Sequence, residues 1–345
     1  MSLLAVDVGA GTQDILLLQD GAPLEGSTKL VLPSQTVIVG RRIDAARAAG
    51  RDIFLRGPTM GGGPCVGAIR RHLSAGLRVY ATPSAAATIS DNLDRVAEMG
   101  VVIQEDEPGS AEVITTGDLD LSSLRRALSL FDLVPPVDIA VAVQDHGHSP
   151  DRSNRLVRFE HLEGAMRMGG GLEAFAYRRP PDVMTRMRAV WELLEGEGCR
   201  SLLMDTGPAA IFGAATDPRC LQPALIINIG NGHTVAAILE DDCIRAIFEH
   251  HTSQLSPERL GVFVQRLCSG SLRSSEIFKD GGHGACIIDL PERIRSTLVT
   301  GPRREQFLRA GVLSGAVAAS PGGDMMIAGC LGLAWAWRRR DDLWR

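Results

Sequence analysis

The sequence has very little lysine. Of its 36 basic residues all but Lys29 and Lys279 are arginine. A Walker-type phosphate loop requires a lysine directly after its glycine turn. The two lysines lie in Ser27-Thr28-Lys29-Leu30 and Phe278-Lys279-Asp280, and neither context matches that loop. The sequence therefore excludes a P-loop nucleotide-binding protein.

The chain also lacks closely spaced cysteines. It has seven, and the nearest two in sequence are Cys268 and Cys286. Without a C-x-x-C pair, a zinc ribbon, a thioredoxin motif and a local iron–sulfur motif are excluded. An odd number of scattered thiols is typical of a reducing compartment. The first residues, Met1 to Asp7, have no basic n-region, so we expect no signal peptide and a cytoplasmic protein.

Long hydrophobic runs and a basic excess are missing as well. The longest late apolar run, Met325 to Trp337, is about two-thirds of a membrane span, so we expect no membrane partner. The 36 basic and 41 acidic side chains give a net charge of −5. No basic segment stands out that would attract nucleic acid, and we expect none as a partner.

What the chain does contain is an alternation of strand and helix patterns, which is typical of an α/β protein. Leu3 to Val8 and Gln13 to Gln19 are expected to form a hairpin, and Ser84 to Met99 a single helix. Residues 150–182 are irregular and could be a lid, a linker or an active-site loop. After Pro223 the opening pattern recurs, with strands at Ala224 to Ile229 and Thr234 to Leu239. This internal echo predicts a duplicated chain, with domains at 1–200 and 201–345 and a cleft between them.

Each half opens with a glycine turn between two strands. The first turn contains Gly9, Gly11, Thr12 and Gln13 after Asp7; the second contains Gly230, Asn231, Gly232, His233 and Thr234 after Asn228. Glycines allow backbone N–H groups to converge on an anion, and Asp7 can hold Mg²⁺. Either turn alone is also compatible with a tight hairpin whose glycines only supply positive φ. The pair together favours a clamp for a di- or triphosphate.

The two turns resemble the phosphate motifs of the superfamily that contains acetate and sugar kinases, heat-shock chaperones and actin. Ser320-Pro321-Gly322-Gly323-Asp324, followed by a small-residue run, resembles the adenosine motif of that superfamily. The resemblance implies a duplicated, ribonuclease H-like ATPase fold with ATP and Mg²⁺ in a central cleft. It implies that Gly322, Gly323 and Asp324 hold the nucleoside. Asn228 departs from the superfamily pattern, which has aspartate there, and this puts a metal at the second motif in question.

A narrower resemblance rests on three segments. They are Asp7 to Asp14, Gln144-Asp145-His146-Gly147 and Phe248-Glu249-His250-His251-Thr252. In these the chain is similar to a prokaryotic family whose members are labelled pyruvate formate-lyase activating enzymes. That label implies a radical enzyme with a C-x-x-x-C-x-x-C iron–sulfur motif. The chain has no such spacing, so the sequence does not support radical chemistry.

Two polar segments could carry the chemistry. Asp145 follows an expected strand at Ile139 to Val143, where it could orient or deprotonate a nucleophile, and His146 could donate a proton or bind phosphate. The alternative is a solvated loop in which Asp145 caps a turn. His250 and His251 follow another strand, and with Asp7, Asp145 and His146 they could form a transition-metal site, although their spacing is not diagnostic.

The sequence thus predicts an ATP- and Mg²⁺-binding protein that transfers or hydrolyses the γ-phosphate. It would be either a small-molecule kinase or an ATPase that activates a partner enzyme, with Asp7 on the metal and Asp145 on the nucleophile. The alternative is a nucleotide- or metal-binding module of the same fold without turnover, which Asn228 favours.

Overall fold

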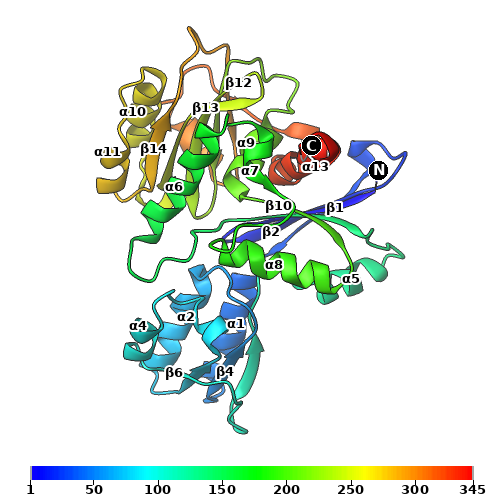
Figure 1. Ribbon diagram of the computed structural model, residues 1–345, viewed down its shortest axis with the longest axis vertical. Helices are drawn as coiled ribbons and strands as arrows, with labels where there is room; N and C mark the ends of the chain where they lie inside the picture. Colours follow the sequence, from blue (N-terminus) through cyan, green and yellow to red (C-terminus); the bar gives the residue numbers. More distant parts are fainter. Residues whose placement is uncertain (1, 344–345) are drawn as a thin grey trace.

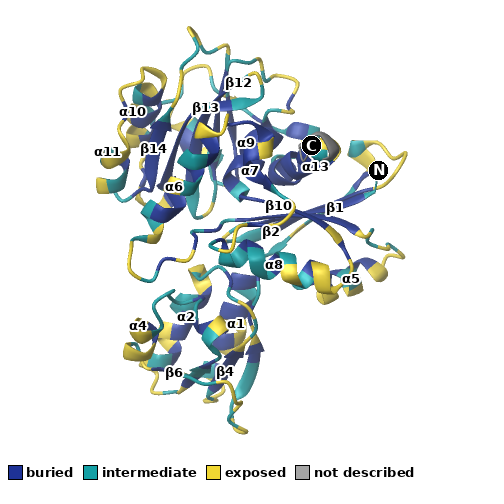
Figure 2. Ribbon diagram, in the orientation of Figure 1, coloured by how far each residue is buried: buried dark blue, intermediate teal, exposed yellow. Residues whose placement is uncertain are grey.

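The computed structural model describes residues 2–343. These residues form three β-sheets. Two six-stranded sheets form the body of the molecule, and a smaller α/β unit projects from it at the bottom of Figure 1. The central strands of both large sheets are buried, whereas the edge strands β3 and β16 are only partly buried and α4 and α5 are largely exposed on their outer sides (Figure 2).

The first sheet has the strand order β3-β2-β1-β8-β10-β9. The first three strands are antiparallel neighbours, and β8 and β10 run parallel to β1. Its strands are β1 (Leu3–Val8), β2 (Thr12–Leu18), β3 (Thr28–Pro33), β8 (Asp138–Val143), β9 (Ala176–Tyr177) and β10 (Arg200–Met204).

The second sheet has the order β14-β13-β12-β11-β15-β16, and five of its strands, β13-β12-β11-β15-β16, repeat the order β3-β2-β1-β8-β10. In this shared part three antiparallel strands are again followed by two that run parallel to the first of them, and β14 adds an antiparallel strand at the edge beside β13. Its strands are β11 (Ala224–Ile229), β12 (His233–Glu240), β13 (Cys243–His251), β14 (Gly284–Ile287), β15 (Ser296–Thr300) and β16 (Val317–Ala318). The repeated order confirms the predicted duplication of an α/β fold.

Two helices between the large sheets join the halves. They are α9 (Thr206–Ala214) and α13 (Ala328–Leu343), and both contribute to one apolar core shared with the two sheets. Their backbones approach very closely, because a Cβ on Gly213 would lie 1.6 Å from the Ala328 carbonyl oxygen. A Cβ on Gly332 would lie 2.0 Å from the Ala209 carbonyl oxygen. Only glycine permits this contact, which packs the C-terminal helix against the first sheet as well.

A separate four-stranded parallel sheet is inserted between β3 and β8. Its order is β6-β5-β4-β7, and it has its own apolar core. The unit comprises α1 (Gln35–Ala48), β4 (Ile53–Arg56), α2 (Gly63–Ser74), β5 (Val79–Ala81), α3 (Pro83–Ala86), α4 (Leu93–Glu98), β6 (Val101–Ile103) and β7 (Glu112–Thr115). The sequence predicted its alternating elements but not that they form a sheet of their own.

Two expectations about helices are wrong. The single helix expected over Ser84 to Met99 is divided into α3 and α4, because Thr82 caps the first and Asn92 caps the second. The segment 150–182 is not irregular throughout, since it contains α6 (Asn154–Arg167), whose side chains Val157, Phe159 and Leu162 are buried.

The remaining helices cover the outer faces of the large sheets. In the first half, α5 (Leu121–Ser129) and α8 (Thr185–Gly196) share a core with β1, β2, β8 and β10. In the second half α10 (Pro257–Cys268), α11 (Ser274–Lys279) and α12 (Arg304–Arg309) pack on the other sheet, and α7 (Leu172–Phe175) lies beside α13. The expected domain boundary between residues 200 and 201 falls within β10 of the first sheet. None of the described helices is long and apolar enough to cross a membrane.

Candidate functional site

The two glycine turns have the same backbone geometry. In the first, the Gly9 N–H donates to the Thr12 carbonyl oxygen at 2.8 Å, and in the second the Gly230 N–H donates to the His233 carbonyl oxygen at 2.9 Å. A second pair of bonds also repeats, because the Gly11 carbonyl accepts from Ser34 and the Gly232 carbonyl accepts from Thr252. His233 therefore stands in the second half where Thr12 stands in the first.

The tips of the two turns face and touch each other. A Cβ on Gly11 would lie 2.6 Å from Asn231 Nδ2, and a Cβ on Gly232 would lie 3.2 Å from the Ala10 Cβ. The tertiary structure thus brings together two turns that are more than two hundred residues apart in sequence. Two other residues predicted here hold neighbouring segments. Gln13 donates to the carbonyl oxygen of Pro33 on β3 at 3.0 Å, and Thr234 shares a hydrogen bond with Thr252, which directly follows β13.

Asp7 lies at the end of β1 beside a second carboxyl group. It is paired with Asp14 on β2, and both side chains are buried. The Thr206 hydroxyl donates to Asp7 at 2.6 Å, whereas Asp14 Oδ1 has no hydrogen-bond partner within the described chain. Burial raises the pKa of Asp7 to about 7 and that of Asp14 to about 8, and the mutual repulsion of the two groups raises that of Asp14 further. Sequence reasoning missed Asp14 as part of this pair.

A small cavity of about 70 Å³ lies between the turns and the start of α13. Asp7, Asp14, Asn228 and Asn231 line one side of it. From the segment predicted to hold a nucleoside, Met325 and Met326 line the other side. Of that segment's predicted residues, Gly322 packs against Leu24, and Asp324 accepts from the Met326 N–H. Gly322 and Gly323 both have positive φ, so this tight turn requires glycine.

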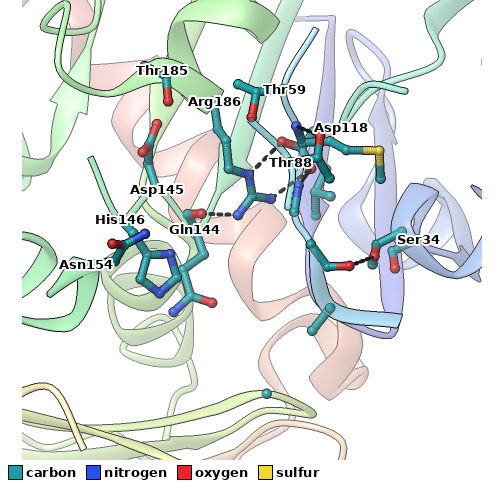
Figure 3. Close-up of a pocket in the computed structure, with 18 of the residues that line it drawn as sticks. Ser34, Thr59, Thr88, Asp118, Gln144, Asp145, His146, Asn154, Thr185 and Arg186 are labelled. Carbon is teal, nitrogen blue, oxygen red and sulfur yellow. Dashed lines mark hydrogen bonds and ion pairs between the residues drawn. The ribbon is translucent and has the colours of Figure 1, made fainter. Parts of the chain in front are cut away.

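A larger cavity of about 390 Å³ lies on the opposite side of the turns, between them and the inserted unit. This volume is in the usual range of small-molecule sites. Gly9, Ala10, Gly232 and His233 line it from the turns. Figure 3 shows Arg186 of α8 at its wall, between Gln144 and Asp118, which follows β7 of the inserted unit. Arg186 donates to both carboxylate oxygens of Asp118, at 2.7 and 2.8 Å, and so fixes the inserted unit over the cavity.

Asp145 is buried at the edge of this cavity, with both carboxylate oxygens occupied. One accepts from the Gly147 N–H at 2.8 Å and the other from the Met187 N–H at 2.9 Å. Burial raises the pKa of this carboxyl group. Asp145 therefore fixes the loop that carries His146, and its role on a nucleophile stays a prediction.

Arg158 of α6 joins the two halves beneath the cavity. Its five hydrogen bonds reach Glu249 on β13, Asp205 before α9 and the Asp145 carbonyl oxygen. The side chain is 2% exposed, and the Glu249 side chain is fully buried. No pattern in the sequence pointed to this arginine, because its partners lie far from it along the chain.

Four imidazole rings gather at the floor of the cavity. They belong to His146 after β8, His233 on β12, His251 at the end of β13 and His283 before β14. The ring centroids of His233, His251 and His283 are 4.8–4.9 Å apart, and that of His146 is 5.5 Å from His283. Among the described residues, the one group of three or more metal-ligating side chains comprises His146, His233 and His283.

Three of these histidines, His146, His233 and His283, have pKa values below the usual range, which favours the neutral ring. Burial lowers the pKa of His283 to about 2, and burial together with the nearby Arg158 keeps the pKa of His146 well below its usual value. Burial has the same effect on His233. His250, which the sequence also suggested, points elsewhere and contacts Asp280 at 3.2 Å. The Gly-Gly-His-Gly run around His283 was the sequence signal that could have placed His283 in this cluster, because glycines on both sides of a histidine allow close packing.

Comparison with known proteins gives one family. A family model described as "Putative pyruvate format-lyase activating enzyme (DUF1786)" matches residues 60–306, more than half of the chain. The comparison with curated proteins found no match.

Several solved structures are similar over nearly the whole chain at low identity. One is the activator of the 2-hydroxyisocaproyl-CoA dehydratase from Clostridium difficile with bound ADPNP, with 9% identity, 99% of this chain and 96% of that chain covered, and a TM-score of 0.38. Another is MreB 5 of Spiroplasma citri bound to AMPPNP, with 8% identity, 99% and 97% covered, and a TM-score of 0.38. A third is a ROK hexokinase from Thermus thermophilus, with 12% identity, 99% and 100% covered, and a TM-score of 0.34.

Proposed function

The protein belongs to the family whose model matches residues 60–306, and from this premise we propose that it binds ATP with Mg²⁺ between its two halves and transfers or hydrolyses the γ-phosphate. The observation that carries the proposal is the pair of glycine turns. They occupy equivalent places in the strand order that the two sheets share, have the same hydrogen bonds and face each other. Backbone N–H groups at such turns are suited to bind phosphate oxygens.

The residues beside the turns fit a magnesium ion. Mg²⁺ prefers oxygen ligands and binds proteins through one or two carboxylates, with the remaining positions taken by water and phosphate. Asp7 and Asp14 supply two adjacent carboxyl groups, and one Asp14 oxygen has no partner in the part of the chain that the structure describes. Bound there, Mg²⁺ would neutralise charge on the phosphates, while Asp7 and Asp14 hold it in place.

The arrangement of the two cavities supports phosphoryl transfer across the turns. Gly9 and Ala10 line both cavities, so a phosphate held by the turns would be accessible from either side. We assign the small cavity and the Met325–Met326 wall to the nucleotide. The large cavity is assigned to the acceptor, which is either a small molecule or the water used in an ATPase that acts on a partner enzyme. Because the small cavity holds about 70 Å³, nucleotide binding requires the turns to separate.

The family description names an activating enzyme of formate-lyase chemistry, but no iron–sulfur chemistry is part of this proposal. The sequence contains no three cysteines at the spacing such a cluster motif needs. An activator that works through ATP-driven conformational change would need only the turns and the movement of the halves.

Isothermal titration of the purified protein with ATP, with and without Mg²⁺, tests the proposal. We expect Mg²⁺-dependent micromolar binding by the natural protein and its loss in Asp7→Asn, which keeps the side-chain size. The control is Asp94→Asn on the exposed side of α4 in the inserted unit. Small-angle scattering should show a changed radius of gyration with Mg·ATP because the turns separate.

The outcomes separate the functions that remain. Phosphate release stimulated by a metabolite would identify a kinase, and stimulation by a protein would identify a partner-directed ATPase. Binding without any turnover would favour a nucleotide-binding module, and turnover gained in Asn228→Asp would then show that Asn228 is the cause. Absence of binding under both conditions would refute the proposal.

A further inference from the structure

The histidines at the floor of the large cavity are not needed for the nucleotide. They come from both halves of the chain: His146 from the first, and His233 and His283 from the second. One nitrogen atom from each lies within 4.8 Å of the other two. In a tetrahedral site with bonds of 2.0–2.1 Å the nitrogens lie about 3.3 Å apart, so small rotations of the side chains would complete the site.

Three of the ring nitrogens in this cluster are buried and lack a hydrogen-bond partner within the described residues. Both ring nitrogens of His283 are buried, and neither has a hydrogen-bond partner among residues 2–343. The same is true of His233 Nε2. Buried polar atoms without partners are rare, because each gives up its bonds to water and gains nothing in return. A bound cation would satisfy them, and neutral imidazole is the form that binds metal.

We propose that His146, His233 and His283 bind a divalent first-row transition ion, with an open coordination position facing the large cavity. Imidazole ligands suit zinc, iron, nickel and copper rather than magnesium. Three protein ligands and one open position characterise zinc sites that bind water or a substrate oxygen. Since His146 and His233 line the cavity and His283 lies buried behind them, the open position would take an oxygen atom of a ligand in the cavity.

The surroundings hold the rings in place. Gly282 and Gly284 flank His283, and a Cβ on Gly284 would lie 2.5 Å from the Phe159 ring, so only glycine lets this segment approach α6. His251 packs against both His233 and His283, and its Nδ1 is 2.8 Å from the Gly281 carbonyl oxygen. Arg158, the arginine that acts on all three ligands, is already paired with the carboxylates of Asp205 and Glu249. The other nearby arginines also have partners: Arg186 pairs with Asp118, and Arg155 donates to the Gly282 carbonyl oxygen.

The test is a Co²⁺ titration of tag-free, chelator-treated protein without nucleotide, followed by visible absorption of the bound ion. We expect one equivalent to bind, and Zn²⁺ to displace it. Affinity should fall at least about tenfold in His146→Gln, His233→Gln and His283→Gln. The matched control is His148→Gln, two residues from His146, whose half-exposed ring pairs with Asp91 outside the cluster. It should bind as tightly as the natural protein.

His146→Gln is the decisive variant, because His146 is only partly buried and its replacement should leave the circular dichroism spectrum unchanged. Pulsed electron paramagnetic resonance of the Cu²⁺-loaded natural protein gives an independent count of bound imidazoles, expected to be three. The proposal is overturned if the natural protein binds no stoichiometric Co²⁺, if fewer than two imidazoles are counted, or if His146→Gln and His148→Gln bind alike. Because nucleotide is absent, these results do not depend on the ATP proposal.

Discussion

Replacing Arg158 by methionine should destabilise the protein more than any surface arginine would. The side chain is 2% exposed and each of its three nitrogens donates, with bonds of 2.8 and 3.0 Å to Glu249 and of 2.5 and 2.9 Å to Asp205. Methionine fills much of the same space but leaves the two carboxyl groups buried without a cation.

The size of the expected destabilisation follows from the burial of the Arg158 side chain. Breaking a buried ion pair by removing one partner costs about 3–5 kcal/mol, because the remaining charge is left without compensation. Arg158→Met should therefore lower the free energy of unfolding by about that amount. In Arg158→Met/Glu249→Gln one of the two orphaned charges is gone, so the double variant should be at least about 1 kcal/mol more stable than the sum of the single changes predicts.

Equilibrium urea unfolding followed by tryptophan fluorescence measures these quantities. The matched control is Arg152→Met, which removes the exposed pair with Glu160 and should cost less than about 1 kcal/mol. If Arg158→Met costs no more than Arg152→Met, or if the double variant is simply additive, the assignment of Arg158 as the charged link between the halves is wrong.

Three further changes test other contacts. Burial raises the pKa of Asp14 to about 8, so the stability that its neutral form provides is lost as the pH rises from about 4 through 8. In the presence of a chelator, Asp14→Asn should match the stability of the natural protein near pH 4 and exceed it at pH 8.5 by up to about 5 kcal/mol. Equal melting curves of the two proteins at pH 8.5 would contradict this. Gly332→Val should destabilise by about 3 kcal/mol or abolish folding, because its Cβ would overlap the Ala209 carbonyl; an unchanged melting temperature would show that α9 and α13 can separate without cost. Arg186→Met should cost about 2–3 kcal/mol and speed proteolysis at the junctions of the inserted unit, because Asp118 is left unpaired; a cleavage rate equal to that of Arg188→Met, a control on the same helix whose carboxylate partners Asp182 and Glu192 are exposed, would argue against this role.

Much of the local structure could be predicted from the sequence. The strands β1 and β11 follow from continuous apolar runs, and the turns at Gly9 and Gly230 follow from glycines directly after them. The equivalence of Asp7 and Asn228 was also visible, because each is the penultimate residue of its strand. The repeated strand–turn–strand pattern therefore predicted the duplication, and the strand order shared by the two sheets confirms it.

Other features depend on contacts between distant segments. The inserted sheet gave the same alternating pattern as its surroundings, and which strands pair is decided by hydrogen bonds that no local pattern encodes. The break between α3 and α4 was missed because capping by Thr82 and Asn92 outweighs the helical pattern between them.

The sequence by itself thus determined the two turns, the carboxylate beside the first and the class of fold, because these depend on neighbours a few residues apart. Only the tertiary structure decided that the turns touch, that Asp14 joins Asp7, and that Arg158 is buried between the halves. It also decided which histidines meet. Adjacent residues of a strand face opposite ways, so only one of His250 and His251 is expected in the cavity, and the tertiary structure places His251 there. It also brings His233 and His283 against that ring, which the spacing along the chain did not indicate. Such groupings arise because two sheets pack around a shared core, and this packing cannot be predicted from the spacing of residues along the chain.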